Sequence, residues 1–267
     1  MSHRKGLEGL EGLEWGYSKE NKNHVQLSST TDRAPTIVVT GGTKGLGRAF
    51  AEIFAARGFD VCVCARTRED LDAMQTDWKE LFPGRRLFTC AADLSKKADI
   101  LHFADFVRAT WPRLDVLINN AGIYLPGTVN SEPEGTLETL MEINLYSAYH
   151  LTRLLLPLMR SYRKGHIFNL CSIASIASYP NGGAYTITKF ALLGFSRALR
   201  EEMKPEGIKV TSLLPGATWS DSWAGADFPP ERLMQPEDIA KLVWAAYDLS
   251  DSAVVEELLI RPQLGDL

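Results

Sequence analysis

The stretch Thr40-Gly41-Gly42-Thr43-Lys44-Gly45-Leu46-Gly47 separates an apolar run, residues 36–40, from a helical stretch near residues 46–57. Gly41 can form a tight turn, Gly45 lets backbone approach a pyrophosphate, and Gly47 lets the helix pack closely on a sheet. The helix N-terminus then offers N–H groups and a positive dipole end to phosphate. Such glycines often serve only a turn, but a strand before and a helix after this loop favour a nucleotide site. The predicted contacts to phosphate are Gly41, Thr43, Lys44, Gly45, Leu46 and Gly47.

Beyond this loop, short apolar runs alternate with longer helical stretches. The apolar runs are residues 36–40, 60–65, 86–91, 115–119, 166–171, 209–214 and 257–260. The helical stretches lie near residues 46–57, 68–82, 97–110, 134–162, 184–204 and 236–249. Strands that are apolar throughout are typical of a parallel sheet covered on both faces, and right-handed crossovers then give a doubly wound sheet. We predict an α/β fold: a single Rossmann-like, doubly wound parallel sheet of about seven strands with helices on both faces.

The composition excludes several classes of protein. The chain has 267 residues, of which 45% are hydrophobic, and a net charge of −4 without a dense run of Lys and Arg. One large domain fits this length, and a nucleic-acid partner is not expected. We expect neither a membrane span nor a secretory signal. The four cysteines show no paired or zinc-type spacing, so we predict reduced thiols, no metal site and a cytoplasmic location.

Residues 1–33 differ from the rest of the chain. Gly-Leu-Glu repeats occupy residues 6–14, and a polar stretch continues to Arg33. Such a low-complexity segment buries little apolar surface. We interpret residues 1–33 as a flexible extension and residues 34–267 as the cofactor-binding domain. The alternative for the extension is a weak amphipathic helix that binds a partner.

The second apolar run indicates which dinucleotide would bind. NAD sites usually carry an acid after the second strand, which binds the ribose 2′-hydroxyl. Here Arg66 follows the run, and Lys44 lies within the glycine loop. Two cations beside the adenosine ribose would neutralise a 2′-phosphate, which favours NADP(H). The alternative is that both are solvated surface charges.

Four residues form a candidate catalytic set. Tyr185 and Lys189 lie four residues apart in a helical stretch, so they share one face. A phenol ionises near pH ~10, and a neighbouring ammonium favours the phenolate. Ser172 follows the fifth strand and could donate a hydrogen bond to a substrate oxygen, or could merely cap the strand end. Asn144 interrupts an apolar helix stripe and could hold a water that links Lys189 to solvent.

Together these residues resemble the short-chain dehydrogenase/reductase family, in its single-domain NADP-dependent form, over about residues 36–260. The loop spacing G-x-x-x-G-x-G and the set Asn144, Ser172, Tyr185 and Lys189 match the family. The resemblance adds cofactor contacts from Asp93, Asn120, Ala121, Gly122, Tyr185, Lys189, Pro215, Gly216 and Ser220. It implies that Tyr185 protonates the carbonyl while Lys189 binds the nicotinamide ribose. It also implies direct hydride transfer between the nicotinamide and a carbonyl or secondary alcohol.

The substrate is less defined than the reaction. Residues 218–235 should cover its site, and Tyr124, Trp219 and Trp223, together with Ser172, are candidate contacts. These aromatic residues suit a compact apolar or aromatic carbonyl compound, although they could only pack the segment onto the core. Resemblance to sepiapterin-reductase-like members suggests a pteridine-type or other small ketone. The alternatives are a 3-oxoacyl-thioester reductase and a non-catalytic NADP-sensing regulator. The family resemblance implies a homodimer, with a homotetramer as the alternative.

Overall fold

A computed structural model describes residues 33–220, 229 and 232–266 of the chain. The chain divides into two compact units, residues 1–33 and 34–267. The predicted flexibility of residues 1–32 and the predicted substrate contact of Trp223 lie outside the described residues. The description below concerns the second unit.

Seven parallel strands form one sheet in the order β3-β2-β1-β4-β5-β6-β7. Their bounds are β1 Thr36–Thr40, β2 Asp60–Ala65, β3 Leu87–Ala91, β4 Val116–Asn119, β5 Gly165–Leu170, β6 Ile208–Pro215 and β7 Glu257–Ile260. The chain builds β1, β2 and β3 outward in one direction, returns to place β4 beside β1, and then continues in the other direction. The predicted doubly wound parallel sheet is confirmed.

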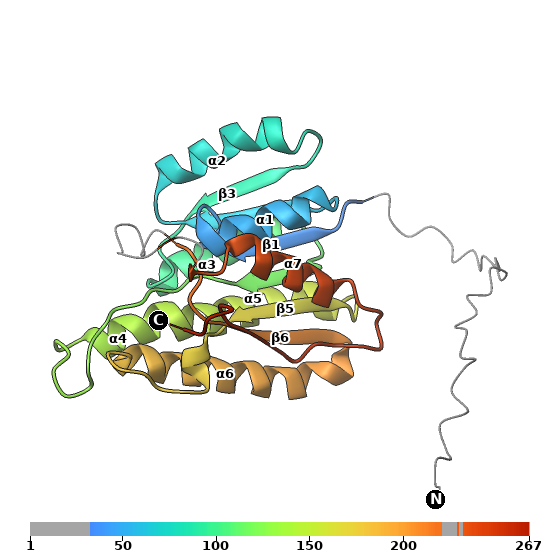
Figure 1. The fold of residues 1–267 in the computed structure, drawn as a ribbon. Coiled ribbons are helices and arrows are strands. Elements are labelled where there is room, and N and C mark those ends of the chain that lie inside the picture. The colour runs from blue at the N-terminus through green and yellow to red at the C-terminus, as the bar shows by residue number, and fades with distance from the viewer. Residues whose placement is uncertain (1–32, 221–228, 230–231, 267) are drawn as a thin grey trace, which may run out of the picture. The chain divides into compact units, whose positions relative to one another are not determined.

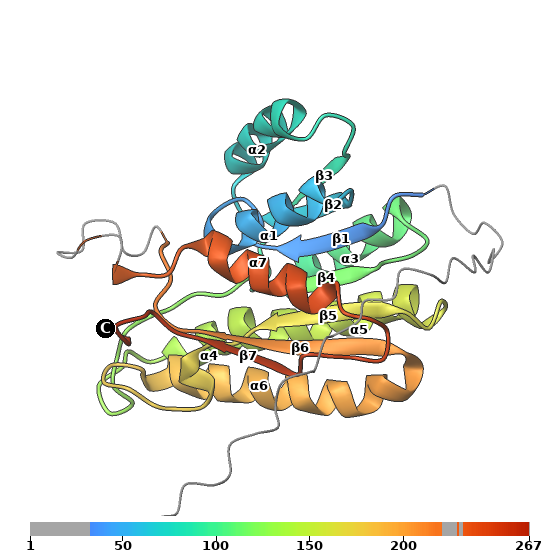
Figure 2. The ribbon, with the colours of Figure 1, turned by 45° about the vertical axis from the view of Figure 1, so that its right-hand side comes forward.

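Helices cover both faces of the sheet (Figures 1 and 2). Their bounds are α1 Gly45–Ala56, α2 Arg68–Leu81, α3 Lys97–Thr110, α4 Thr136–Met141, α5 Ser147–Arg160, α6 Gly183–Met203 and α7 Pro236–Tyr247. Side chains of α1, α2 and α7 join one apolar cluster, whereas those of α3, α5 and α6 join another on the opposite face. The β-branched residues of the central strands lie between these layers and are fully buried.

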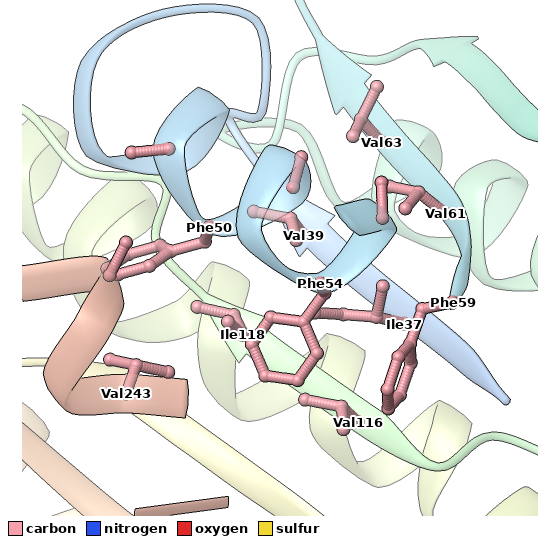
Figure 3. Close-up of a cluster of buried hydrophobic side chains, with 14 of the residues drawn as sticks. Ile37, Val39, Phe50, Phe54, Phe59, Val61, Val63, Val116, Ile118 and Val243 are labelled. Carbon is pink, nitrogen blue, oxygen red and sulfur yellow. The ribbon is translucent and has the colours of Figure 1, made fainter. Parts of the chain in front are cut away.

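Phe54 of α1 lies at the centre of the first cluster (Figure 3). Its ring meets those of Phe59 at 5.0 Å and of Trp244 and Tyr247 at 5.4 Å, all edge to face. Such aromatic contacts add to the free energy gained by burying the rings. They fix α1 and α7 against the sheet, and so they fix the glycine loop from which α1 begins.

One predicted helix is interrupted. The stretch predicted near residues 134–162 consists of α4, a π-helical segment η1 at Glu142–Tyr146, and α5. Asn144 lies in the middle of this π segment. Single π turns inside α-helices often mark functional sites, and hydrophobic periodicity alone does not reveal them.

Candidate functional site

A cleft of about 1140 Å³ lies at the carboxyl ends of the strands. Open parallel sheets bind ligands at this edge. Most residues predicted for the cofactor and the reaction line this cleft: Gly41, Thr43, Lys44, Gly45, Leu46, Gly47, Arg66, Asn120, Ala121, Gly122, Ser172, Tyr185, Lys189, Pro215, Gly216 and Ser220. The predicted substrate contacts Tyr124 and Trp219 also line it. Asp93 and Asn144 do not.

The glycine loop has the geometry expected of a phosphate cradle. Gly41 has a φ of +62°, and its N–H donates to the carbonyl of Cys64 at 2.9 Å. A Cβ on Gly47 would lie 2.1 Å from the carbonyl oxygen of Gly41, so only glycine fits there. Lys44, the N-cap residue of α1, makes no capping hydrogen bond with its side chain. The first amides of α1 can therefore bind an anion placed in the loop.

The turn after β4 holds this loop in place. Asn120 Nδ2 donates to the carbonyls of Thr40 at 2.8 Å and Gly41 at 3.0 Å. In return, Thr40 Oγ1 accepts from the backbone N–H groups of Asn120 and Ala121, each at 2.9 Å. Asn120 thus serves the loop through its side chain as well as lining the cleft.

The end of the cleft that is predicted to bind adenosine contains an acid, Asp70, that the sequence analysis did not single out. Lys44 Nζ lies 3.1 Å from Asp70 Oδ2, and both residues line the cleft beside Arg66. Within the described part of the chain, Arg66 forms no ion pair. Asp70 lies in the first turn of α2, and the sequence analysis predicted that this helix begins at Arg68. The position of Asp70 in that turn could therefore have indicated that its side chain faces the glycine loop. A 2′-phosphate here would meet two cations and one carboxylate.

Asp93 points into its own turn rather than into the cleft. Its Oδ1 accepts from the Ser95 backbone N–H at 3.1 Å and from the Ser95 hydroxyl at 2.8 Å. Burial alone would raise the pKa of Asp93, but these hydrogen bonds and nearby Lys96 hold it below its usual value. Its neighbours Ala92 and Leu94 line the cleft instead. A contact between Asp93 and adenine stays a prediction.

Tyr185 and Lys189 project from the first two turns of α6. Lys189 is only 4% exposed, and its Nζ donates to the carbonyl of Leu170 at 2.8 Å. The same Nζ lies 5.6 Å from the centroid of the Tyr185 ring. The carbonyl fixes the ammonium beside the phenol, and the end of β5 supplies that carbonyl. The phenol of Tyr185 and the amino group of Lys189 therefore share one wall of the cleft.

Ser172 both caps a turn and lines the cleft. Its hydroxyl oxygen accepts from the Ala174 N–H at 3.1 Å, at the start of the short 3₁₀ helix η2, Ile173–Ser175. The two readings of this residue are thus compatible. A hydroxyl that accepts one hydrogen bond keeps its own hydrogen to donate, and here a substrate oxygen could receive it.

Asn144 is 1% exposed and uses its amide inside the protein. Its Oδ1 accepts from the Ile123 N–H at 2.8 Å, and its Nδ2 donates to the Ile123 carbonyl at 3.0 Å and to Thr188 Oγ1 at 3.1 Å. Thr188 in turn donates to the carbonyl of Tyr185 at 2.8 Å. Asn144 therefore joins the turn after β4 to the helix that carries Tyr185. Its role in holding a water stays a prediction.

Aromatic side chains line another part of the cleft. The ring of Tyr124 meets that of Tyr185 edge to face at 5.0 Å. Tyr179, which the sequence analysis did not identify, lines the same region, and burial together with neighbouring Tyr185 and Tyr124 raises its pKa. Ile176 and Pro180 complete the wall. This end of the cleft suits an apolar or aromatic group.

The segment after β7 also reaches the cleft, and it was not anticipated. Asp266 Oδ1 accepts from the Ala217 N–H at 3.3 Å, and its carboxylate pairs with Arg261. A Cβ on Gly216 would lie 2.1 Å from Asp266 Oδ1. Arg232 donates to the carbonyls of Gly265 at 2.7 Å and Asp266 at 3.1 Å. Residues 261–266 thus hold both Ala217 and Arg232, which lie on either side of residues 218–231.

Comparisons with known proteins identify what this architecture is similar to. A family model described as short chain dehydrogenase matches residues 35–227. Sepiapterin reductase of Chlorobaculum tepidum is 30% identical over 239 residues, which is 86% of this chain and 97% of that protein. Within the described residues, no helix is both long and apolar enough to cross a membrane.

Solved structures share the fold across nearly the whole second unit. A metagenomic short-chain oxidoreductase in complex with NADP is 31% identical, with a TM-score of 0.75, and the match covers 86% of this chain and 97% of that one. L-Sorbose reductase of Gluconobacter frateurii, complexed with NADPH and L-sorbose, is 26% identical. Its TM-score is 0.78, and the match covers 86% of this chain and 95% of that one.

Proposed function

The chain belongs to the short-chain dehydrogenase family, and from this premise we propose that it is an NADP(H)-dependent oxidoreductase with Tyr185 as its acid/base. Its reaction interconverts a carbonyl compound and a secondary alcohol. The observation that carries this proposal is the shared wall: the Tyr185 phenol, the Lys189 ammonium and the Ser172 hydroxyl line one cleft with the glycine loop.

The residues around the loop fit a dinucleotide. Gly47 leaves no room for a side chain, the first amides of α1 carry no side-chain cap, and Asn120 fixes the loop. These groups would bind the pyrophosphate, while Lys44 and Arg66 would bind the 2′-phosphate. Two structural neighbours were crystallised with NADP or NADPH, which supports this choice of cofactor. When bound, the reduced cofactor supplies the hydride.

The chain's own groups handle the proton and the substrate oxygen. The Tyr185 hydroxyl protonates the carbonyl oxygen during reduction and accepts the proton back during oxidation. Lys189, held by the Leu170 carbonyl, would bind the nicotinamide ribose beside the phenol. The Ser172 hydroxyl donates to the substrate oxygen and stabilises the charge that develops there. Asn144 keeps the Tyr185 helix joined to the turn after β4.

For the substrate we propose a small apolar or aromatic ketone, such as a pteridine-type diketone. The aromatic wall formed by Tyr124 and Tyr179 supports this class, as does similarity to a sepiapterin reductase. Oxidation of NADPH is measured against a pteridine diketone, an acetoacetyl thioester, aromatic aldehydes and keto sugars. We expect the pteridine diketone or an aromatic aldehyde to give the highest kcat/KM. Absence of turnover with every compound, together with tight binding of NADPH, would favour a cofactor-sensing protein instead.

We also propose that residues 34–267 form the catalytic domain and that it acts as a homodimer. Removal of residues 1–33 should leave kcat/KM and the melting temperature of the protein nearly unchanged. Sedimentation of the shortened and full-length chains tests the oligomeric state of both. A large fall in melting temperature on removal would show that the extension packs on the domain.

A further inference from the structure

Glu132 supplies the first turn of α6 with a cap from a distant part of the sequence. Its Oε1 accepts from the Ala184 N–H at 2.7 Å, although the two residues are 52 positions apart. Ala184 immediately precedes Tyr185. The N-cap residue of α6 is Gly182, which has no side chain to serve this amide. A carboxylate at a helix N-terminus satisfies free N–H groups and interacts favourably with the helix dipole.

Two glycines make the space that this carboxylate occupies. A Cβ on Gly183 would lie 1.6 Å from Glu132 Oε1, and a Cβ on Gly127 would lie 2.5 Å from Glu132 Cγ. The backbone on either side is joined by a bridge between Gly127 and Gly182, and the Gly127 N–H donates to the Asn181 carbonyl at 3.1 Å. The half-buried Glu132 side chain is therefore enclosed between the loop after β4 and the start of α6.

The contact between Glu132 and Ala184 also bears on the aromatic side chains that line the cleft. Tyr124, from the same loop as Glu132, donates its hydroxyl hydrogen to the Asn181 carbonyl at 3.3 Å and meets the ring of Tyr185 edge to face. In the described part of the chain, no Lys or Arg side chain pairs with Glu132, and its carboxylate binds the N-terminus of α6 instead. Tyr124 and Tyr185 thus belong to two segments that the Glu132 carboxylate joins.

We propose that Glu132 is a positioning residue for the reaction, which holds Tyr185 and Tyr124 in register across the cleft. Its side chain is not among those that line the cleft, and it acts through the Ala184 amide. This inference rests on the proposed function, because its effect on turnover requires Tyr185 to be the acid/base. A displacement of about 1 Å at a reacting group can lower a rate by up to roughly a hundredfold.

The first experiment compares Glu132→Ala with Glu132→Gln. The alanine variant removes the acceptor and should lower kcat by roughly tenfold to a hundredfold, while the Kd for NADPH stays unchanged. The glutamine variant keeps a carbonyl oxygen for Ala184 and loses only the charge, so its kcat should stay within about threefold of the native value. Glu134→Ala, an exposed acid on the same loop, is the matched control and should have no effect. Equal kcat in the native, alanine and glutamine proteins would overturn the proposal.

A double-mutant cycle tests whether Glu132 acts where the structure places it. The nearest atoms to a Cβ on Gly127 all belong to the Glu132 side chain. Gly127→Ala alone should therefore displace the carboxylate and lower kcat. The same change in the Glu132→Ala background should add almost nothing, because the obstructing atoms are gone. Losses that simply multiply would contradict the proposed contact.

Hydrogen exchange separates this inference from the proposed function. Amides in the first turn of α6 should exchange faster in Glu132→Ala than in the native protein, and Glu132→Gln should restore their protection. This readout needs no substrate and no turnover. If the native protein shows no reductase activity but Glu132→Ala exchanges faster, the contact between Glu132 and α6 is supported and the role of Tyr185 as acid/base is rejected. If exchange is unchanged in Glu132→Ala, the positioning role of Glu132 is rejected even when the enzyme is active.

Discussion

Polar side chains occur at both edges of the sheet, but those proposed for the reaction lie at one edge, around the cleft of about 1140 Å³. At the amino edge, Asp60 is 2% exposed and binds Arg86, and Asp115 accepts from both the N–H and the hydroxyl of Thr36. His166 bonds with Thr211 at 2.8 Å. Each of these side chains has a partner within the chain, although Nδ1 of His166 is buried without a hydrogen-bond partner among the described residues.

At the carboxyl edge, the corresponding groups surround the cleft. Ser172 keeps a hydrogen to donate, the Tyr185 phenol lies at the cavity, and α1 begins without a side-chain cap. A polar residue at a strand end is therefore not in itself a sign of function, because the amino edge of this sheet also carries Asp60, Asp115 and His166. What distinguishes the carboxyl edge is that its donors and acceptors line one cleft with room for a ligand. Substitutions at the two edges should thus affect different measurements.

The largest expected effect is at the carboxyl edge. Tyr185→Phe removes the hydroxyl that we propose protonates the carbonyl, and it keeps the ring that packs against Tyr124. We expect kcat to fall by roughly 10²–10⁴-fold, while NADPH affinity and the melting temperature stay close to native. Steady-state kinetics, fluorescence titration with NADPH and thermal unfolding measure the three quantities. Turnover at the native rate would remove Tyr185 from the chemistry.

At the amino edge, the expected effect is on stability. Asp115→Ala takes the acceptor from the buried Thr36 N–H and the ion pair from Arg113, and should cost about 3 kcal/mol of unfolding free energy. The kcat of the folded fraction should not change. Asp251→Ala, which breaks only an exposed pair with Lys164, should cost less than about 0.5 kcal/mol and serves as the control. A lower kcat in an Asp115→Ala protein that is fully folded would contradict the prediction that the amino edge affects only stability.

A pH titration tests the amino edge without removing a contact. Burial, with a smaller contribution from Lys209, lowers the pKa of His166 from 6.5 to about 3. Between these values the unfolded chain binds the proton and the folded chain does not, so stability falls as the pH falls below 6.5. The loss should reach roughly 2 kcal/mol at pH 5 and stop growing below about pH 3.

His166→Gln provides the control for that titration, because other groups also titrate in acid. Urea unfolding of both proteins from pH 7 to pH 4 should show a shallower loss in the variant, which has no imidazole to protonate. Parallel curves for the two proteins would show that His166 does not carry this part of the pH dependence.

The smallest expected effect returns to the carboxyl edge, at the exposed adenosine end of the cleft. Arg66→Asp should weaken NADPH binding by roughly tenfold and NADH binding much less, because only NADPH carries the 2′-phosphate. Asp70→Asn should act in the opposite direction, since it removes the carboxylate beside Lys44. Isothermal titration with both cofactors measures the difference. Equal losses for NADPH and NADH in Arg66→Asp would contradict a 2′-phosphate site at this position.

Sequence analysis predicted the features that depend on local pattern. The predicted strand bounds agree with the observed ones within one residue, because each strand is a short apolar run that ends at a turn. The glycine loop could be identified because a strand precedes it and a helix follows it. A similar reason explains why the sequence could indicate Ser172, Tyr185 and Lys189 as candidates. Two of these residues share a helix face, and the third follows a strand.

Features that depend on contacts between distant segments were not predicted. Glu132 meets Ala184 across 52 positions, and Asp266 meets Ala217 across 49. Nothing in the local sequence of either acid indicates its partner. The π-helical turn at Asn144 was not predicted for the same reason. The side-chain amide of Asn144 forms hydrogen bonds with Ile123 and Thr188, which are 21 and 44 positions away.

The strand order also governs how the chain can assemble as it is synthesised. β1 pairs with β2 on one side and with β4 on the other, but β4 begins only at Val116. A ribosome that has released the first three strands thus leaves one hydrogen-bonding side of Ile37, Val38 and Val39 without its neighbour. Parallel pairs of such large separation form slowly, and an open apolar strand edge can pair with another chain. The central strand, on which the glycine loop depends, is complete only after β4 has been released.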